Sequence, residues 1–190
     1  MPNSTEKILK AAVECFFQHG YNTANISMIS RYAGISRVTI HKQFKSKEDL
    51  FRAVVRQHID ESMANLTVYR NSEQNFWQET ENIIQERCVE MFEEVRSALV
   101  RADLMHAGQE FCQDIIEAEE SSLFNCIKLR LNKEINANRL TLERVNMSVD
   151  DFARILKSAP LGLAVSNLDI NNNQFVKNLM KIFKESTHLS

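Results

Sequence analysis

The chain has 190 residues, which allows one or two domains with a sizeable core, and its net charge of −2 does not by itself indicate a nucleic-acid partner. It contains only four glycines and two prolines, and it lacks alternating strand patterns joined by Asn-Gly or Asp-Gly turns, which excludes a β-rich fold. The first ten residues lack the apolar core of a secretion signal, and no uncharged apolar stretch is long enough to span a bilayer, so we expect a cytoplasmic all-α protein.

The first predicted helix begins at Asn3 or Ser4, either of which can cap it, and runs to about His19. One apolar face follows the helical spacing of three and four residues and is formed by Ile8, Ala12, Cys15 and Phe16. Gly20 ends the helix, and Tyr21 is expected to fold back onto it.

The next stretch, residues 26–44, has the pattern of two short helices joined by a tight turn. Asn25 is the predicted cap of the first helix, and Gly34 breaks the apolar pattern where a left-handed backbone is needed. Ser36 is expected to cap the second helix, which runs to Phe44. This pattern is typical of a helix–turn–helix, whose second helix enters the major groove of DNA.

This region resembles the N-terminal segment of the TetR (tetracycline-repressor-like) family of bacterial regulators. The residues that carry the resemblance recur in register over about the first quarter of the chain: Ile8-Leu9, Ala11-Ala12, Phe16, Gly20-Tyr21, Ile29-Ser30, Ala33-Gly34-Ile35-Ser36, Thr39-Ile40-His41, Phe44, Ser46-Lys47-Glu48 and Leu50. Three positions depart from the family pattern, since Ala24 replaces a threonine, Val38 a glycine and His41 a tyrosine. The resemblance implies an all-α fold of about nine helices, with a three-helix DNA-binding head (residues 1–50) and a helical body for effector binding and dimerisation (residues 51–190).

Charge is unevenly distributed along the chain. Residues 1–56 hold nine Lys or Arg against four Asp or Glu, a balance of +5, whereas the remainder has a balance of −7. A basic head on an acidic body suits phosphate binding by the head. The alternative is chance clustering, but the helix–turn–helix pattern lies in the same segment.

Eight residues in or beside the predicted recognition helix are candidates for contacts with DNA: Ser27, Ser36, Arg37, Val38, Thr39, His41, Lys42 and Lys47. An arginine can bridge guanine O6 and N7, and a threonine can contact a thymine methyl group or a phosphate. The lysines and serines are phosphate candidates, and His41 takes the place of the family's phosphate-contacting tyrosine. Val38 either contacts a thymine methyl group or packs against the protein; the others could instead be surface residues or helix caps.

Beyond the head, Ser46 and Asp49 form a capping-box variant that begins a fourth helix, extending to about Val68. A polar break is expected at residues 69–75, and Gly108 is expected to end a short helix. The apolar spacing predicts helices over residues 75–97, 98–107, 109–136, 149–168 and 174–185.

The last two predicted helices carry apolar stripes too extensive for lone surface helices. Ser148 and Asp151 cap the first of them, Pro160 should kink it, and Asn171-Asn172-Asn173 separates it from the second. TetR-family members pair these two helices with their copies in a second subunit, so the resemblance implies a homodimer that binds a palindromic DNA operator. The alternative is that both helices only close the core of the monomer.

Aromatic, sulfur-containing and histidine side chains are scattered over the middle helices: Trp77, Met91, Phe92, Met105, His106, Phe111, Cys112 and Phe124. Each of them could simply belong to the core. Because family members keep a ligand cavity among these helices, the resemblance implies that these side chains line an effector pocket, with His106 as its polar contact. Such a lining would suit a small hydrophobic effector.

No catalytic, metal-binding or cofactor motif is present, so we expect neither an enzyme nor a bound cofactor. Buried free thiols are the simplest interpretation of the four cysteines, Cys15, Cys88, Cys112 and Cys126, with a redox-sensing pair as the alternative. We therefore predict a ligand-responsive homodimeric transcriptional regulator, most simply a repressor. The competing hypothesis is a helical protein–protein adaptor that retains the head as a packing module.

Overall fold

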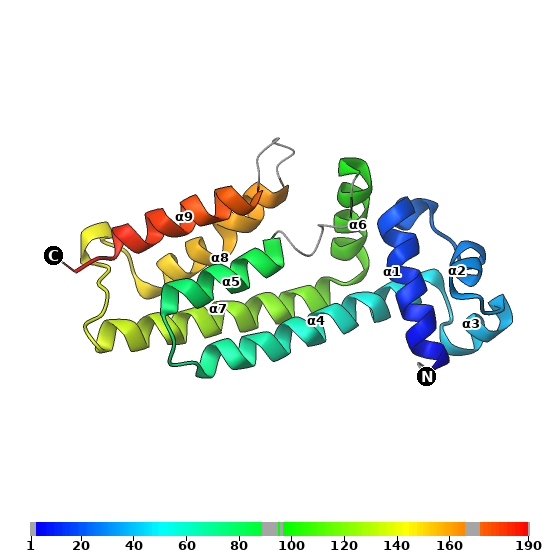
Figure 1. The fold of residues 1–190 in the computed structure, drawn as a ribbon, viewed down its shortest axis with the longest axis horizontal. Helices are drawn as coiled ribbons and strands as arrows, with labels where there is room; N and C mark the ends of the chain where they lie inside the picture. Colours follow the sequence, from blue (N-terminus) through cyan, green and yellow to red (C-terminus); the bar gives the residue numbers. More distant parts are fainter. Residues whose placement is uncertain (1–2, 89–94, 96, 166–171, 190) are drawn as a thin grey trace. The chain divides into compact units, whose positions relative to one another are not determined.

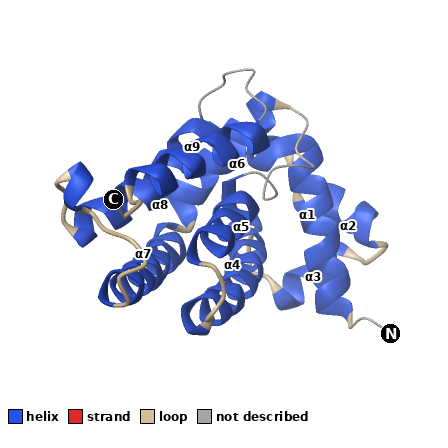
Figure 2. Cartoon of the chain, turned by 60° about the vertical axis from the view of Figure 1, so that its left-hand side comes forward, coloured by secondary structure: helices blue, strands red, loops and turns tan. Residues whose placement is uncertain are grey.

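The computed structural model describes residues 3–88, 95, 97–165 and 172–189, and every regular element within these ranges is helical (Figure 1 and Figure 2). The elements are α1 (Ser4–Thr23), α2 (Ile26–Ala33), α3 (Arg37–Gln43), α4 (Lys47–Asn71), α5 (Phe76–Cys88), α6 (Ala98–Phe111), α7 (Gln113–Asn136), a 3₁₀ turn (Glu143–Val145), α8 (Val149–Val165) and α9 (Asn172–Ser186). The predicted all-α fold is confirmed. None of the helices in these ranges combines the length and the apolar character needed to cross a bilayer.

The chain forms two compact units, and two of the three boundaries between them fall inside α4 and α7. The first, which we call the head unit, comprises Met1–Glu61 and Glu94–Ala118, and the second, the body unit, comprises Ser62–Glu93 and Glu119–Ser190. The head unit therefore contains α6, which packs against α1, in addition to the three N-terminal helices. The predicted functional division after residue 50 stays a prediction.

The first helix of the head unit begins as its sequence predicts, but it is interrupted at Gly20, where the sequence predicts its end, and continues to Thr23. The Asn3 side chain accepts from the backbone N–H of Glu6, and the Glu6 carboxylate accepts from the backbone N–H of Asn3, which completes a capping box. Gly20 interrupts α1 with a φ of 79° and a ψ of 170°, a combination that essentially only glycine adopts. The bend turns Tyr21 into the core, where its ring centroid lies 5.0 Å from that of Phe111 in α6.

Polar contacts attach α6 and the start of α7 to the N-terminal helices within the head unit. The Asp103 carboxylate accepts from the backbone N–H of Asn22 at 3.0 Å and from its side-chain amide at 2.5 Å. The Arg52 guanidinium of α4 donates to both oxygens of Asp114, at 2.9 and 2.8 Å. The head unit is thus held together by residues that lie 62 and 81 positions apart in the sequence.

Gly108 does not end a helix, contrary to the prediction. The helix continues through it to Phe111, and the backbone N–H of Cys112 donates to the Gly108 carbonyl. Gly108 is buried, with the Ile116 side chain 3.5 Å from the place that a Cβ would occupy. Tertiary packing on this face outweighs the weak helix propensity of glycine, so the chain stays helical.

Two other predicted breaks were also misplaced. The fourth helix continues to Asn71, because Tyr69 is buried in the core of the body unit and does not lie in a polar joint; the break covers residues 72–75. The last helix begins at Asn172, so two of the three asparagines expected to separate α8 from α9 belong to α9. The third, Asn171, lies outside the described residues, as do positions 89–94 of the helix predicted over 75–97.

The body unit is built around one apolar core to which all of its helices contribute. Its buried members are Leu66, Tyr69, Phe76, Ile84, Leu123, Cys126, Ile127, Leu131, Leu140, Leu142, Phe152, Ala153, Leu156, Val176, Met180 and Phe183. Helix α8 begins at the predicted Ser148–Asp151 cap, contains Pro160, and lies beside α9 (Figure 1). Both helices also leave apolar side chains in solvent, with Ile155 41% and Ile182 64% exposed.

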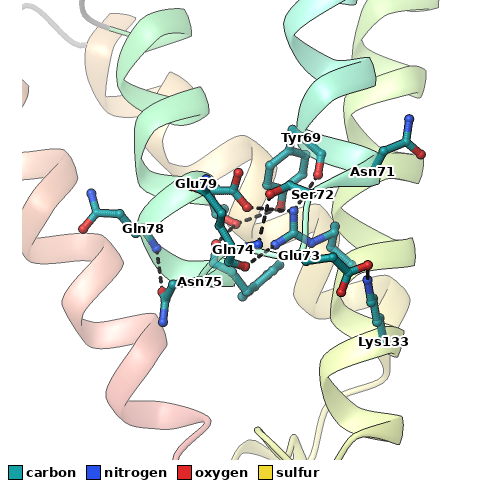
Figure 3. A network of polar contacts seen from close by, with 12 residues as sticks. Tyr69, Asn71, Ser72, Glu73, Gln74, Asn75, Gln78, Glu79 and Lys133 are labelled. Atoms are coloured by element: carbon teal, nitrogen blue, oxygen red, sulfur yellow. Dashed lines mark hydrogen bonds and ion pairs between the residues drawn. The ribbon is translucent and has the colours of Figure 1, made fainter.

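A buried arginine organises the polar contacts where α4 ends and α5 begins (Figure 3). One terminal nitrogen of the Arg130 guanidinium donates to the Tyr69 carbonyl at 2.5 Å and to the Glu79 carboxylate at 2.9 Å, and the other donates to the Gln74 carbonyl at 3.0 Å. Its guanidinium carbon also lies 4.9 Å from the centroid of the Tyr69 ring. Helix α7 is thereby tied to the connection between α4 and α5.

Burial should make three of the four thiols slow to react in the folded protein. Cys15, Cys112 and Cys126 are free and buried, whereas the Cys88 side chain lies outside the described residues. Burial raises the pKa of all three thiols, that of Cys112 to about 11 from an ordinary 9.0, which leaves roughly 100-fold less reactive thiolate at neutral pH. We expect Ellman's reagent to label at most one cysteine quickly in the native protein and all four after denaturation. Rapid labelling of two native thiols would contradict this.

Candidate nucleic-acid interface

Helices α2 and α3 form a helix–turn–helix whose turn is set by local contacts. The Asn25 side chain caps α2 by accepting from the backbone N–H of Met28. Gly34 ends α2 in the left-handed region, with a φ of 62° and a ψ of 28°. The Ile35 N–H then donates to the Ser30 carbonyl, and the Ser30 hydroxyl donates to the Ile35 carbonyl at 2.6 Å. The predicted cap and the predicted glycine turn are both confirmed.

Helix α3 is capped at one end and anchored on one face. The Ser36 hydroxyl accepts from the backbone N–H of Thr39 at 3.1 Å and lies 2.9 Å from the Thr39 hydroxyl. The anchoring face is provided by Ile40, which is fully buried, and by Phe44, which follows the helix. Because Ile40 points into the head core, the opposite side of α3 must face outward.

Gln43 is a positioning residue that sequence reasoning missed. Its side-chain carbonyl accepts from the Thr5 hydroxyl at 2.7 Å, and its amide donates to the Ser4 hydroxyl at 2.8 Å. These contacts join the end of α3 to the first turn of α1, 38 or 39 residues away. No local signal could have identified it, because an exposed glutamine at the end of a helix is an ordinary surface residue.

Four of the predicted DNA-contacting residues gather on the outward side of α3. Arg37, Val38, His41 and Lys42 are exposed and together line an open depression of about 480 Å³. Two permanent cations and an imidazole thus surround one apolar side chain. A surface of this composition can neutralise phosphates and contact base edges at the same time.

A fifth candidate, Ser27 of α2, is in contact with Arg37. One terminal nitrogen of the Arg37 guanidinium donates to the Ser27 hydroxyl at 3.3 Å. This contact links α2 to α3 and restricts the arginine at the start of the helix. Direct contact of Ser27 and Ser36 with phosphate stays a prediction, since both hydroxyls already have partners within the head.

Lys47 differs from the other cations in being half-buried and already engaged. Its ammonium group donates to the Tyr21 carbonyl at 2.7 Å and lies 4.1 Å from the centroid of the Tyr21 ring. Burial lowers the pKa of this ammonium group. The observed contacts give Lys47 a structural role at the end of α1, and its role as a phosphate contact stays a prediction.

The residues predicted to line an effector pocket fall into different parts of the structure. Trp77 and Phe124 pack at the margin of the body core, whereas the other four that can be placed belong to the head unit: Met105, His106, Phe111 and Cys112. The His106 side chain is 78% exposed and lies 3.6 Å from the Glu110 carboxylate. The remaining two, Met91 and Phe92, lie outside the described residues.

The family model for bacterial regulatory proteins of the tetR family matches residues 8–54, a segment that contains α2, α3 and most of α1. This segment of the chain matches the DNA-binding part of the TetR family. Two curated HTH-type regulators also match part of the chain. The transcriptional regulator RutR of Escherichia coli strain K12 is 38% identical over 63 residues, and the transcriptional repressor AcnR of Corynebacterium glutamicum is 40% identical over 55.

A likeness of fold to solved structures extends beyond this segment. FadR of Bacillus subtilis, solved in complex with stearoyl-CoA, superposes with a TM-score of 0.73 at 16% identity and covers 96% of this chain and 98% of its own. The sequence matches are shorter: the aligned segments cover 33% of this chain and 30% of RutR, and 29% of this chain and 29% of AcnR. The match to the tetR-family model thus lies within the head unit, whereas the likeness of fold covers nearly the whole chain.

Proposed function

We propose that this TetR-family chain is a cytoplasmic, non-enzymatic transcriptional regulator that acts as a repressor, binds a palindromic operator as a homodimer, and is released by a small hydrophobic effector. The observation that carries the proposal is the outward side of α3, where Arg37, His41 and Lys42 are exposed while Ile40 anchors the helix. A recognition helix that enters the major groove needs one face buried against the rest of the head and an opposite face that is exposed and positively charged. The names of the relatives, a regulator and a repressor, agree with it.

The homodimer is supported by the apolar side chains that α8 and α9 leave in solvent. Ile182 is 64% and Ile155 41% exposed, and Phe175 and Leu179 of α9 are only half-buried although Val176 faces the core. An apolar surface of this kind is typical of subunit contacts. A two-fold pair would present two copies of α3 to successive half-sites of a palindrome. A monomer in sedimentation experiments, at concentrations that bind DNA, would contradict this part of the proposal.

The effector part of the proposal concerns release from DNA. An effector shifts a regulator between two states only by as much as it binds one state more tightly than the other. Trp77 and Phe124 provide aromatic surface at the margin of the body core, which suits an apolar ligand. FadR, which shares the fold, was solved in complex with stearoyl-CoA, whose acyl chain is apolar.

Alanine substitution of Arg37 and Lys42 tests the DNA-binding function. We expect Arg37→Ala to weaken binding to an operator selected from random DNA by about 10- to 100-fold, because a bidentate contact with guanine is lost. Lys42→Ala should weaken binding to all sequences and reduce the slope of log affinity against log salt by about 1, since one phosphate contact is lost. Fluorescence anisotropy with labelled duplexes at several salt concentrations measures both.

Lys133→Ala is the matched control, because it removes an exposed lysine from α7, outside both α3 and the α8–α9 surface proposed for dimerisation. It should bind DNA as the unchanged protein does. If Arg37→Ala and Lys42→Ala also bound normally, the regulator would be excluded and the adaptor hypothesis favoured, since an adaptor that uses the head only for packing would not need these side chains.

A further inference from the structure

We infer that Val38 contacts the C5-methyl group of a thymine in the operator, next to the base contacted by Arg37, and so sets part of the sequence preference. The inference rests on the proposed DNA-binding function and specifies which base, thymine, and which group on that base, the C5-methyl group, Val38 contacts. It starts from one observation: Val38 is 67% exposed, although it is apolar and lies on a seven-residue helix. An exposed valine in this position has no packing role in the head.

The surroundings of Val38 show which partner it suits. Its neighbours on the outward side of α3 are Arg37, His41 and Lys42, so the valine is the apolar centre of a cationic surface. A protein partner with an apolar patch would have to bury the charges of Arg37 and Lys42 without compensation. A DNA duplex provides partners for both the cations and the valine. Its phosphates pair with the cations, and its major groove contains one apolar group, the methyl group of thymine.

The backbone around Val38 limits where its methyl groups can reach. Ser36 caps the helix on one side, and the fully buried Ile40 fixes the rotation of α3 on the other. Valine is β-branched and holds essentially one side-chain rotamer in a helix, so its methyl groups are presented at a defined place. Arg37, restricted by its contact with Ser27, precedes Val38 by one residue, and both side chains line the same depression.

The chemistry predicts a paired preference in each half-site. The arginine would contact O6 and N7 of a guanine, and the valine would cover the methyl group of a thymine within one or two base pairs of it. Removal of one methyl group from an apolar contact should weaken binding about 3- to 10-fold per half-site. Where the family pattern has glycine at this position, the contact would be missing, so the preference belongs to this chain.

The test uses the full chain and operators selected from random duplex DNA. Each thymine of the selected operator is replaced in turn by deoxyuridine, which lacks only the methyl group, and affinities are measured for the unchanged protein and for Val38→Ala. We expect one symmetric pair of thymines to matter. Replacing both of them should reduce the operator affinity of the unchanged protein by about 10- to 100-fold. Val38→Ala should bind more weakly to the thymine operator and should be indifferent to the replacement.

Val38→Thr is the matched control, because it keeps the β-branched shape and one methyl group and should retain part of the discrimination. Melting temperatures show that the variants are folded. The inference would be wrong if no deoxyuridine replacement reduced the operator affinity of the unchanged protein. It would also be wrong if the replacement reduced the affinity of Val38→Ala as much as that of the unchanged protein. Neither result would contradict operator binding itself. Absence of any sequence-specific binding would overturn the proposed function as well.

Discussion

Replacing Arg130 by alanine should lower the free energy of unfolding by about 3–5 kcal/mol. The arginine is 1% exposed, and its loss removes the cation from the Glu79 carboxylate, whose side chain is only 17% exposed. The substitution also removes a hydrogen-bond donor from the main-chain carbonyls of Tyr69 and Gln74 (Figure 3). Breaking one side of a buried pair is costly, because the remaining charge and carbonyls stay away from water.

Equilibrium unfolding in urea, followed by circular dichroism, measures this effect. Lys133→Ala is the control on the same helix, because the Lys133–Glu73 ion pair of Figure 3 lies at the surface, with the Glu73 side chain 80% exposed. Ion pairs at the surface contribute little to the free energy of unfolding, so the urea midpoint of Lys133→Ala should match that of the unchanged protein. Arg130→Lys, which keeps a charge but loses the planar fork, should fall between the two. Equal midpoints for Arg130→Ala and Lys133→Ala would contradict the assignment.

Gly20→Ala should destabilise the protein by about 2–4 kcal/mol, the second large effect that the structure predicts. The φ of 79° with a ψ of 170° strains any residue that has a side chain. A Cβ at this position would also overlap the Asp103 carboxylate, which is held in place by two hydrogen bonds from Asn22. The two costs add, because the backbone strain is local to residue 20, whereas the collision is relieved only if the Asp103 side chain gives up its hydrogen bonds to Asn22.

Gly34→Ala separates the two contributions. Gly34 also has a positive φ, of 62°, but no atom lies within 4 Å of the place that its Cβ would occupy. We expect a loss of only about 1 kcal/mol, which reflects the left-handed backbone without a collision. Thermal unfolding of both variants gives the comparison, and a Gly20→Ala variant no less stable than Gly34→Ala would show that the approach of Asp103 is unimportant.

Caps and turns could be predicted from the sequence because their partners lie within a few residues. The Ser46 hydroxyl accepts from the Asp49 N–H at 2.9 Å, and the Ser148 hydroxyl from the Asp151 N–H at 3.1 Å, as their spacing indicated. The same holds for the Gly34 turn, whose conformation depends on the missing side chain of that residue. The helix–turn–helix consists of such local features, which is why the candidate interface was identifiable before any tertiary contact was known.

Helix ends without a strong local signal were predicted less well. Gly108 and Tyr69 have the sequence character of breaks, yet both lie inside helices, because their faces are buried against other helices. The engagement of Lys47 with Tyr21 was equally hidden, since the two residues are 26 positions apart. At the two misplaced helix ends, a tertiary contact outweighs a local preference of about 1 kcal/mol or less.

The amino-acid order was sufficient to specify the helical class, the glycine-hinged helix pair and the cationic character of its second helix, since each depends on residues one or two turns apart. Three features are decided only by the tertiary structure: the placement of α6 in the head unit, the position of Arg130 among main-chain carbonyls, and the exposure of Val38. They depend on contacts between residues 50 to 80 positions apart, or on which side of a helix such contacts cover. Backbone connectivity does not bring such residues together, so their positions follow from how whole helices pack.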